Sequence, residues 1–180
     1  MESLRGQLLI AAPSLLDPNF ERTVVLIAEH SEEGAMGLVL NRASDTLVGE
    51  AVPELEDLAG EDVVHVGGPV APNSVVILGD YEDPDDAGLL VYGGVGLPSA
   101  DSDLEGLADT TRRVRIFAGH AGWGPGQLDA ELERDDWIVA RALPEDPFTD
   151  DPDGLWSRVL ARKGGQFALV ARMPLDPSLN

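Results

Sequence analysis

The sequence of 180 residues contains no cysteine, and this absence excludes several kinds of chemistry. Without thiols the chain has no disulfide framework, no thiolate nucleophile and no thiolate metal ligand, and it suits the reducing cytoplasm. Long apolar runs are also missing, because none approaches the ~20 residues that a membrane-spanning helix needs. Residues 1–5 lack the basic start and apolar stretch of a signal peptide. We therefore expect a cytoplasmic protein that does not cross a membrane.

Positive charge is scarce. Eleven arginines and Lys163 stand against 33 acidic residues, which gives a formal net charge of -21. A field of this sign repels phosphate backbones and anionic lipid, so we expect neither direct nucleic-acid binding nor membrane contact. The arginines cluster at Arg112, Arg113 and Arg115, where alternation places the last two on one face of a strand. We interpret this as a solvated face, since a binding patch normally needs more cations.

The remaining composition is that of a soluble globular protein, with 43% hydrophobic and 25% charged residues, and the length fits a single domain over residues 1–180. Short aliphatic or β-branched segments bounded by turn residues predict about nine strands. The polar connection at residues 29–35 is short enough for a hairpin, so the second and third strands should be antiparallel. The predicted strands are 7–11, 23–28, 36–40, 63–66, 74–78, 89–92, 114–118, 137–142 and 167–173.

Helical patterns are fewer. Apolar spacings of three and four predict helices over residues 101–111, with Asp101 or Ser102 as its N-cap, and over residues 127–134. Capping oxygens, an early proline and a glycine pair as the stop predict a third helix over residues 151–163. A weaker helix at residues 48–58 is divided by Pro53. Two acidic, proline-containing stretches, 80–86 and 144–153, should be surface loops.

A glycine-rich turn, FAGHAGWGPGQL at residues 117–128, is the first candidate site. Its four glycines permit positive φ and let the backbone approach a neighbour or a ligand closely. Pro125 favours a helix start, so free amides near Gly126 and Gln127 could face an anion or a carbonyl oxygen, with Trp123 as the wall of a recess. Packing alone is the alternative, because glycines also let a strand bend and a tryptophan pack on backbone.

Two further turns join this candidate recess. The glycines before Pro69 make a tight turn after the strand 63–66, whose amides either face the same recess or form a bare turn. Asn41 and Arg42 end the third strand, where an internal pair with a carboxylate is favoured over a bound anion. The predicted ligand-binding residues are Asn41, Arg42, Gly67, Gly68, Pro69, Gly119, His120, Gly122, Trp123, Gly124, Gly126 and Gln127.

Enzymatic motifs are incomplete. His30, His65 and His120 fall near predicted strand ends, but their spacing is not that of a metal site. The turn has no serine at an elbow position, so it is not a nucleophile turn. We predict no catalytic residue, no metal and no cofactor. The alternative is a hydrolase-like or metal-dependent enzyme that uses His120 and nearby carboxylates.

Four ordered motifs carry a resemblance to the YqgE/AlgH family of bacterial proteins, and it covers nearly the whole chain. They are DPNFERTVV at residues 17–25, GAMGLVLNR at 34–42, GGPV at 67–70 and AGHAGWGPGQL at 118–128. The resemblance implies an α+β fold with a mixed, largely antiparallel branched sheet rolled into a pseudo-barrel and flanked by helices. The biochemical activity of the family is not established.

The family name partly reflects a proposed role in transcriptional regulation. This sequence has no helix-turn-helix pattern and no basic recognition helix, so we expect any regulatory role to be indirect. His120 stands where relatives often have tyrosine, which argues against imidazole catalysis. We expect a non-catalytic binding protein with a glycine-rich recess for a small anion or a protein partner, in an oligomeric state that the sequence leaves open.

Overall fold

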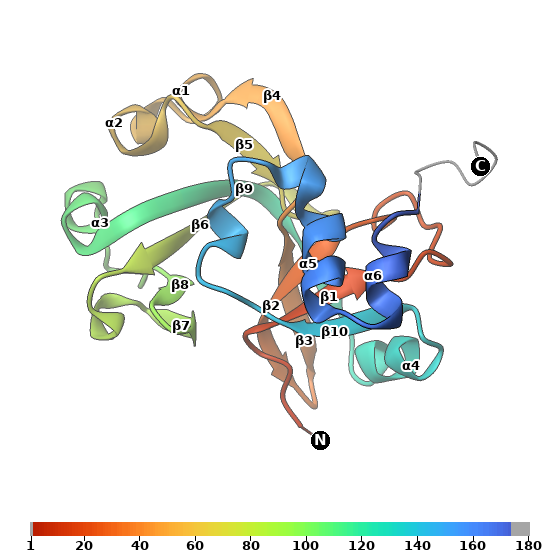
Figure 1. Cartoon of the computed structure of the whole chain (residues 1–180). Helices are drawn as coiled ribbons and strands as arrows, with labels where there is room; N and C mark the ends of the chain where they lie inside the picture. Colours follow the sequence, from red (N-terminus) through yellow and green to blue (C-terminus); the bar gives the residue numbers. More distant parts are fainter. Residues whose placement is uncertain (1, 174–180) are drawn as a thin grey trace.

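The structure, a computed structural model, describes residues 2–173 and combines a large sheet with short helices (Figure 1). The strands are β1 (Gln7–Ala11), β2 (Val24–Ser31), β3 (Gly34–Val39), β4 (Ala43–Leu47), β5 (Val63–Val66), β6 (Val70–Tyr81), β7 (Leu89–Tyr92), β8 (Val95–Leu97), β9 (Thr111–Trp123) and β10 (Trp137–Arg141). The helices are α1 (Val48–Ala51), α2 (Glu56–Ala59), α3 (Leu104–Thr110), α4 (Gln127–Glu133), α5 (Leu155–Lys163) and α6 (Gln166–Val170). This confirms the expected α+β class.

The sheet is mixed, largely antiparallel and branched, as the resemblance implies. Its main path runs β10-β1-β2-β3-β9-β6-β8-β7, and β5 attaches to β9 beside this path with β4 on its far side. The β5–β9 pair is parallel, while the other pairs are antiparallel. Within the described residues, the edge strands β10 and β7 do not pair with each other, so the sheet is not closed. The expectation of a pseudo-barrel was wrong in this detail.

The strands β1, β2 and β3 are buried on both faces, which explains their nearly continuous apolar sequences. One face carries Leu8, Ile10 and Leu26 and is covered by α5 and α6 (Figure 1). The opposite face carries Leu9, Val25 and Ile27 and is covered by α4 and by the pair Trp123 and Trp137. The predicted hairpin forms between β2 and β3, with Ser31 opposite Gly34.

The last strand of the sequence prediction is wrong, because residues 166–170 form α6. Gly164 and Gly165 have φ values of +80° and +59°, so they end α5 and reverse the chain. Phe167, Val170 and Ala171 then pack on the first face of the sheet at spacings of three and four. A short apolar run fits either secondary structure, and here its contacts with the core select the helix.

Both stretches predicted as surface loops are in part buried. Asp80 and Tyr81 end β6 with 6% and 1% of their surfaces exposed. In the second stretch, Asp146–Phe148 forms a buried turn of 3-10 helix. The Asp146 carboxylate accepts hydrogen bonds from the Leu143 amide at 2.7 Å and from both terminal nitrogens of Arg162 at 3.0 and 2.8 Å. The prediction failed because the cationic partner of this acid lies on another element.

The predicted ends of the helix at residues 151–163 are found in the structure. The Asp151 carboxylate accepts a hydrogen bond from the Gly154 amide and caps a 3-10 turn at Pro152–Gly154, which leads into α5, and α5 ends at Gly164 as expected. The cap of α3 is Asp103, later than predicted, with its carboxylate 2.7 Å from the Gly106 amide. Among residues 2–173 no helix is long and apolar enough to cross a membrane.

Two arginines on α5 allow a matched test of these contacts. Replacing Arg162 by alanine leaves the buried Asp146 carboxylate without its cation, and we expect a loss of about 3–5 kcal/mol in the free energy of unfolding. Arg158→Ala breaks an exposed pair with Asp151 and should cost at most about 1 kcal/mol. Urea unfolding of the two variants measures the difference. Equal losses would contradict a structural role for the buried pair.

Candidate functional site

The glycine-rich turn lies at the branch of the sheet. Gly67 and Gly68, at the end of β5, run directly against Gly119 and His120 of β9. A Cβ on Gly67 would overlap the carbonyl oxygen of Gly119, and one on Gly68 would overlap the main chain of His120. Gly119 itself has a φ of +73°, which favours glycine. Beyond Gly119, β9 leaves β5 and pairs with β3.

The remaining glycines of the turn lie in open surroundings. The Gly124 amide donates to the Gln127 side-chain oxygen at 3.1 Å, and the Gln127 amide donates back to the Gly124 carbonyl at 3.1 Å. Gly126, with a φ of +73°, has open space where a Cβ would lie. The turn therefore satisfies part of its own main chain, and α4 beyond it has only seven residues.

Trp123 is held by polar and aromatic neighbours and is only 6% exposed. Its indole nitrogen and that of Trp137 both donate to one carboxylate oxygen of Glu131, at 3.2 and 3.0 Å. Phe20 stacks on the ring with a centroid separation of 6.3 Å. The ring does border a hollow of about 540 Å³, but Arg5, His30 and Met36 line it rather than the turn at Pro69.

Asn41 and Arg42 have internal partners. The Asn41 side chain accepts from the Val24 amide and donates to the Arg22 carbonyl, both at 2.9 Å. Arg42 donates to the carbonyl oxygens of Asn19 and Pro18, both at 2.8 Å. The favoured pairing of Arg42 with a carboxylate was therefore wrong, because the loop before β2 presents main-chain oxygens there. Ligand contacts by the predicted residues remain a prediction.

The arginine cluster on β9 is solvated only in part, because Arg112 and Arg113 are exposed while Arg115 is half-buried. Arg113 contacts Asp80 at 3.1 Å and lies over the Phe148 ring at 4.7 Å. Arg115 donates to the carbonyl oxygens of Pro147 and Thr149, at 3.3 and 2.7 Å. Both arginines fasten the segment that follows β10, and the alternation placed them correctly on one face.

His65 is the most buried histidine, with 2% of its surface exposed, and its Nε2 atom has no partner among the described residues. It lies on β5 against the Phe117 ring. Burial, together with the nearby positive charge of Arg115, lowers the pKa of His65 to about 4. His30 and His120 occupy β2 and β9. Residues 2–173 contain no group of three His, Asp or Glu side chains placed to hold a metal ion.

A feature that the sequence analysis missed lies beside the glycine turn. Val66 and Val75 pair with Ala118 from opposite sides, so the three side chains form one row across β5, β9 and β6. Val70 lies next to this row, and its side chain covers the position that a Cβ on Gly122 would occupy. We call these four residues the valine strip. Val66, Val70 and Val75 are 42%, 42% and 46% exposed, although the next row, with Ile116, is buried.

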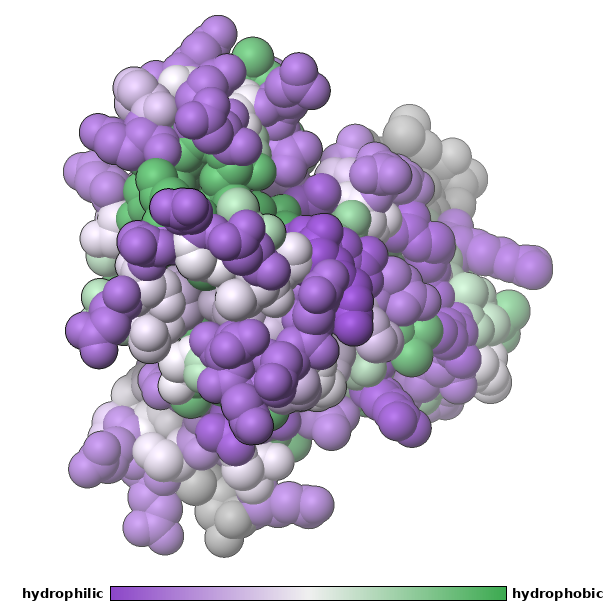
Figure 2. Space-filling view, turned by 90° about the vertical axis from the view of Figure 1, so that its left-hand side faces the viewer, coloured by the Kyte–Doolittle hydropathy of each residue, from purple (hydrophilic) through white to green (hydrophobic). Residues whose placement is uncertain are grey.

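Hydrophobic residues gather on the surface below the lobe that contains α1 and α2 (Figures 1 and 2). The strip adjoins a hydrophobic cluster of this lobe through Ala118. In that cluster Leu55, Ala59 and Ile116 are buried, and Leu58 and Ala118 pack against them. Strand alternation alone indicates that Val75 and Ile77 share a face, but the row across three strands depends on register.

The part of the chain that supplies Val66, Val70 and Val75 is rich in acids. Residues 43–111 contain no lysine or arginine, although they include 16 of the 33 acidic residues. These acids are Asp45, Glu50, Glu54, Glu56, Asp57, Glu61, Asp62, Asp80, Glu82, Asp83, Asp85, Asp86, Asp101, Asp103, Glu105 and Asp109. The first cation after Arg42 is Arg112, which pairs with Asp80 at 3.5 Å.

Comparison with known proteins places this architecture in a described class. The family model AlgH-like matches residues 8–168, so the chain belongs to the AlgH-like family. A UPF0301 protein of Streptomyces coelicolor is 46% identical, with 100% of this chain and 97% of the relative covered. One of Mycolicibacterium smegmatis is 42% identical over 97% of this chain and 90% of the relative.

Two solved structures share the fold. A crystal structure of a Corynebacterium diphtheriae protein has a TM-score of 0.81 and 32% identity, covering 95% of this chain and 92% of that one. The solution structure of the AlgH protein from Pseudomonas aeruginosa has a TM-score of 0.72 and 31% identity, covering 96% and 95%. The family resemblance is thereby confirmed, and it assigns no activity.

Substitutions at two glycines with the same φ distinguish the cost of backbone strain from the cost of disrupted close packing. Gly126→Ala should lose about 1–2 kcal/mol of unfolding free energy through its φ of +73° alone. Gly119→Ala has the same φ and also brings a Cβ within 2.5 Å of the Gly68 carbonyl oxygen, so we expect a further loss of about 1–3 kcal/mol. Thermal and urea unfolding measure both variants. Similar losses would mean that the close approach is not required.

The lowered pKa of His65 has a consequence for acid stability. The unfolded chain takes up a proton near pH 6.5, whereas the folded chain does so only near pH 4. Stability is therefore retained above pH 6.5 and is lost as the pH falls toward 4, by up to about 3 kcal/mol. His65→Gln removes this titration, so unfolding free energies from pH 7 to 4 should show a shallower fall than in wild type. Parallel curves would contradict the buried neutral imidazole.

Proposed function

We propose that this protein is a non-catalytic binding protein that docks a partner protein on the valine strip. The supporting observation is the cross-strand row of Val66, Ala118 and Val75, in which both valines keep more than two fifths of their surfaces exposed. A row of aliphatic side chains on a rigid sheet contributes favourably when a partner covers it, at about 25 cal/mol per Å² of apolar area.

In this proposal the glycine-rich turns position the valines of the strip and do not themselves form a recess for an anion. The turn Gly67-Gly68-Pro69 joins Val66 to Val70, and the close approach at Gly119 fixes where those valines stand. The site then recognises a partner's side chains rather than a small anion. Regulation by such a protein is indirect, through protein contact, because the acidic surroundings oppose nucleic acid.

An enzymatic role receives no comparable support. His120 is half-buried on β9, opposite Val70, and the other histidines lie on β2 and β5. We therefore put forward binding as the single function.

Unbiased peptide selection tests the docking strip. Peptides selected on the wild-type protein from a random displayed library should bind the double variant Val66→Ser/Val75→Ser at least about tenfold more weakly by calorimetry, because apolar contact is lost. The substitutions are neutral, so the local charge stays the same. Leu16→Ser, which removes an aliphatic side chain that is 69% exposed elsewhere, is the matched control. Selected peptides that bind the variant and wild type equally would refute docking at the strip.

A further inference from the structure

We infer that the partner segment on the valine strip is cationic, with aliphatic side chains flanked by lysine or arginine. This inference rests on the proposed function and adds the chemistry of the partner. It follows from the acidic residues near the strip and from the absence of ion pairs between them and cations of the described chain.

Among the described residues, the acids of α1, α2 and α3 form no ion pair within 4 Å. The five ion pairs found in residues 2–173 use Asp80, Asp136, Asp146 and Asp151. None of them involves an acid from α1, α2 or α3, or from the turns beside these helices. Burying apolar residues of a partner against such a surface brings its flanking residues close to free carboxylates, which favours positive side chains.

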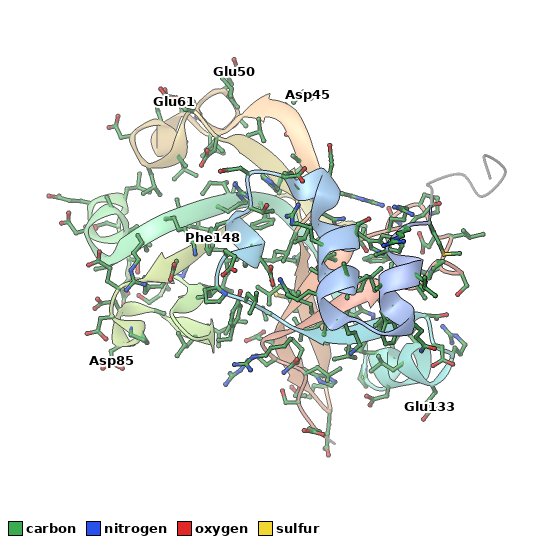
Figure 3. The ribbon with its side chains drawn as sticks, viewed as in Figure 1. Asp45, Glu50, Glu61, Asp85, Glu133 and Phe148 are labelled. Atoms are coloured by element: carbon green, nitrogen blue, oxygen red, sulfur yellow. The ribbon has the colours of Figure 1, made fainter. Side chains whose placement is uncertain are left out.

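The exposed carboxylates nearest the strip belong to the lobe that contains α1 and α2. On the side of α1 and α2, exposed acids include Glu54, Asp57 and Glu61, and Figure 3 shows Glu50 and Glu61 on the upper lobe. α3 carries Glu105 and Asp109, both exposed, but it leads into Thr111 at the start of β9, seven residues before Ala118. A segment lying along the strip therefore meets negative charge on the side of α1 and α2.

A hollow of about 480 Å³ on the α2 side fits a long cationic side chain. The acidic residues Glu56, Asp57, Glu61 and Asp62 contribute to its lining. Leu58 lines the same hollow and belongs to the apolar cluster that contains Ala118. A lysine or arginine can lay its methylene stem along such apolar surface while its charged end reaches the carboxylates.

The same charges disfavour a second copy of this chain as the occupant. The exposed acids beside the strip, which include Glu54, Asp57 and Glu61, form what we call the acidic rim. A symmetric pair would bring the acidic rim of one copy against that of the other, and like charges across an interface are destabilising. An acidic peptide or an anionic membrane surface is disfavoured for the same reason. A basic protein segment satisfies both the apolar strip and the rim.

Three synthetic peptides with one aliphatic centre and flanking Lys, Gln or Glu residues test the inference on the full-length protein. We expect the Lys peptide to bind at least about tenfold more tightly than the Gln peptide by calorimetry, and the Glu peptide not to bind. Amide NMR shifts should map the Lys peptide to Val66, Val75 and Ala118. Equal affinities of the Lys and Gln peptides at the strip would overturn the cationic partner and leave docking intact.

The other outcomes separate the two proposals. If none of the three peptides changes the amide NMR shifts of the valine strip while library-selected peptides do, the cationic inference fails and docking stands. If library-selected peptides also leave the strip unaffected, the proposed function itself fails.

Matched charge variants give a second, independent reading. Asp57→Asn/Glu61→Gln should weaken the Lys peptide by about three- to tenfold and leave the affinity of the Gln peptide unchanged. Asp129→Asn/Glu133→Gln removes the same two side-chain types from α4, where Figure 3 places Glu133 at the opposite end of the molecule, and should change neither affinity. Equal weakening by both variants would show that overall charge, rather than the rim, attracts the peptide.

Discussion

The close approach of two main chains, at Gly67 and Gly68 on one side and Gly119 on the other, is the contact on which the architecture depends. Side chains at these positions would overlap carbonyl oxygens or main-chain atoms of the opposite segment. Because the chains meet there, β9 can pair with β5 and β6 as far as His120 and with β3 from Ala121 onward. The same contact places Val66 and Val70 on either side of the Gly67-Gly68-Pro69 turn.

The sequence predicts the parts of the fold that depend on local pattern. Continuous apolar runs indicate β1, β2 and β3 because both faces of these strands are buried. Asp151 and Gly164 likewise mark the start of the 3-10 turn that leads into α5 and the end of α5. The strands β4 and β8 were missed, since the first is mostly exposed and the second has three residues. The helix α6 was predicted as a strand because a five-residue apolar run has no decisive period.

Less of the candidate site than of the fold could be predicted from the sequence. The glycine-rich pattern singles out the positions of Gly67 and Gly119. It does not reveal their contacts, because each glycine packs against a segment that is far away in the sequence. The valine strip was missed for a similar reason, because the row depends on the register of Val66 and Val75 with Ala118. Arginine partners were also misjudged. Arg42 and Arg115 donate to carbonyl oxygens, which no pattern of charged residues reveals, and this use of scarce cations leaves carboxylates elsewhere unpaired.

The stretch without lysine or arginine, residues 43–111, affects the rate at which positively charged molecules associate as well as their affinity. Its negative potential extends roughly 8 Å into a solution of physiological ionic strength and pulls oppositely charged molecules toward that side before any contact forms. For the proposed basic partner, this orients collisions, so association would be fast and would slow steeply as salt is added. Dissociation of the proposed complex would depend instead on the few aliphatic contacts of the valine strip, so the complex would form quickly and exchange readily.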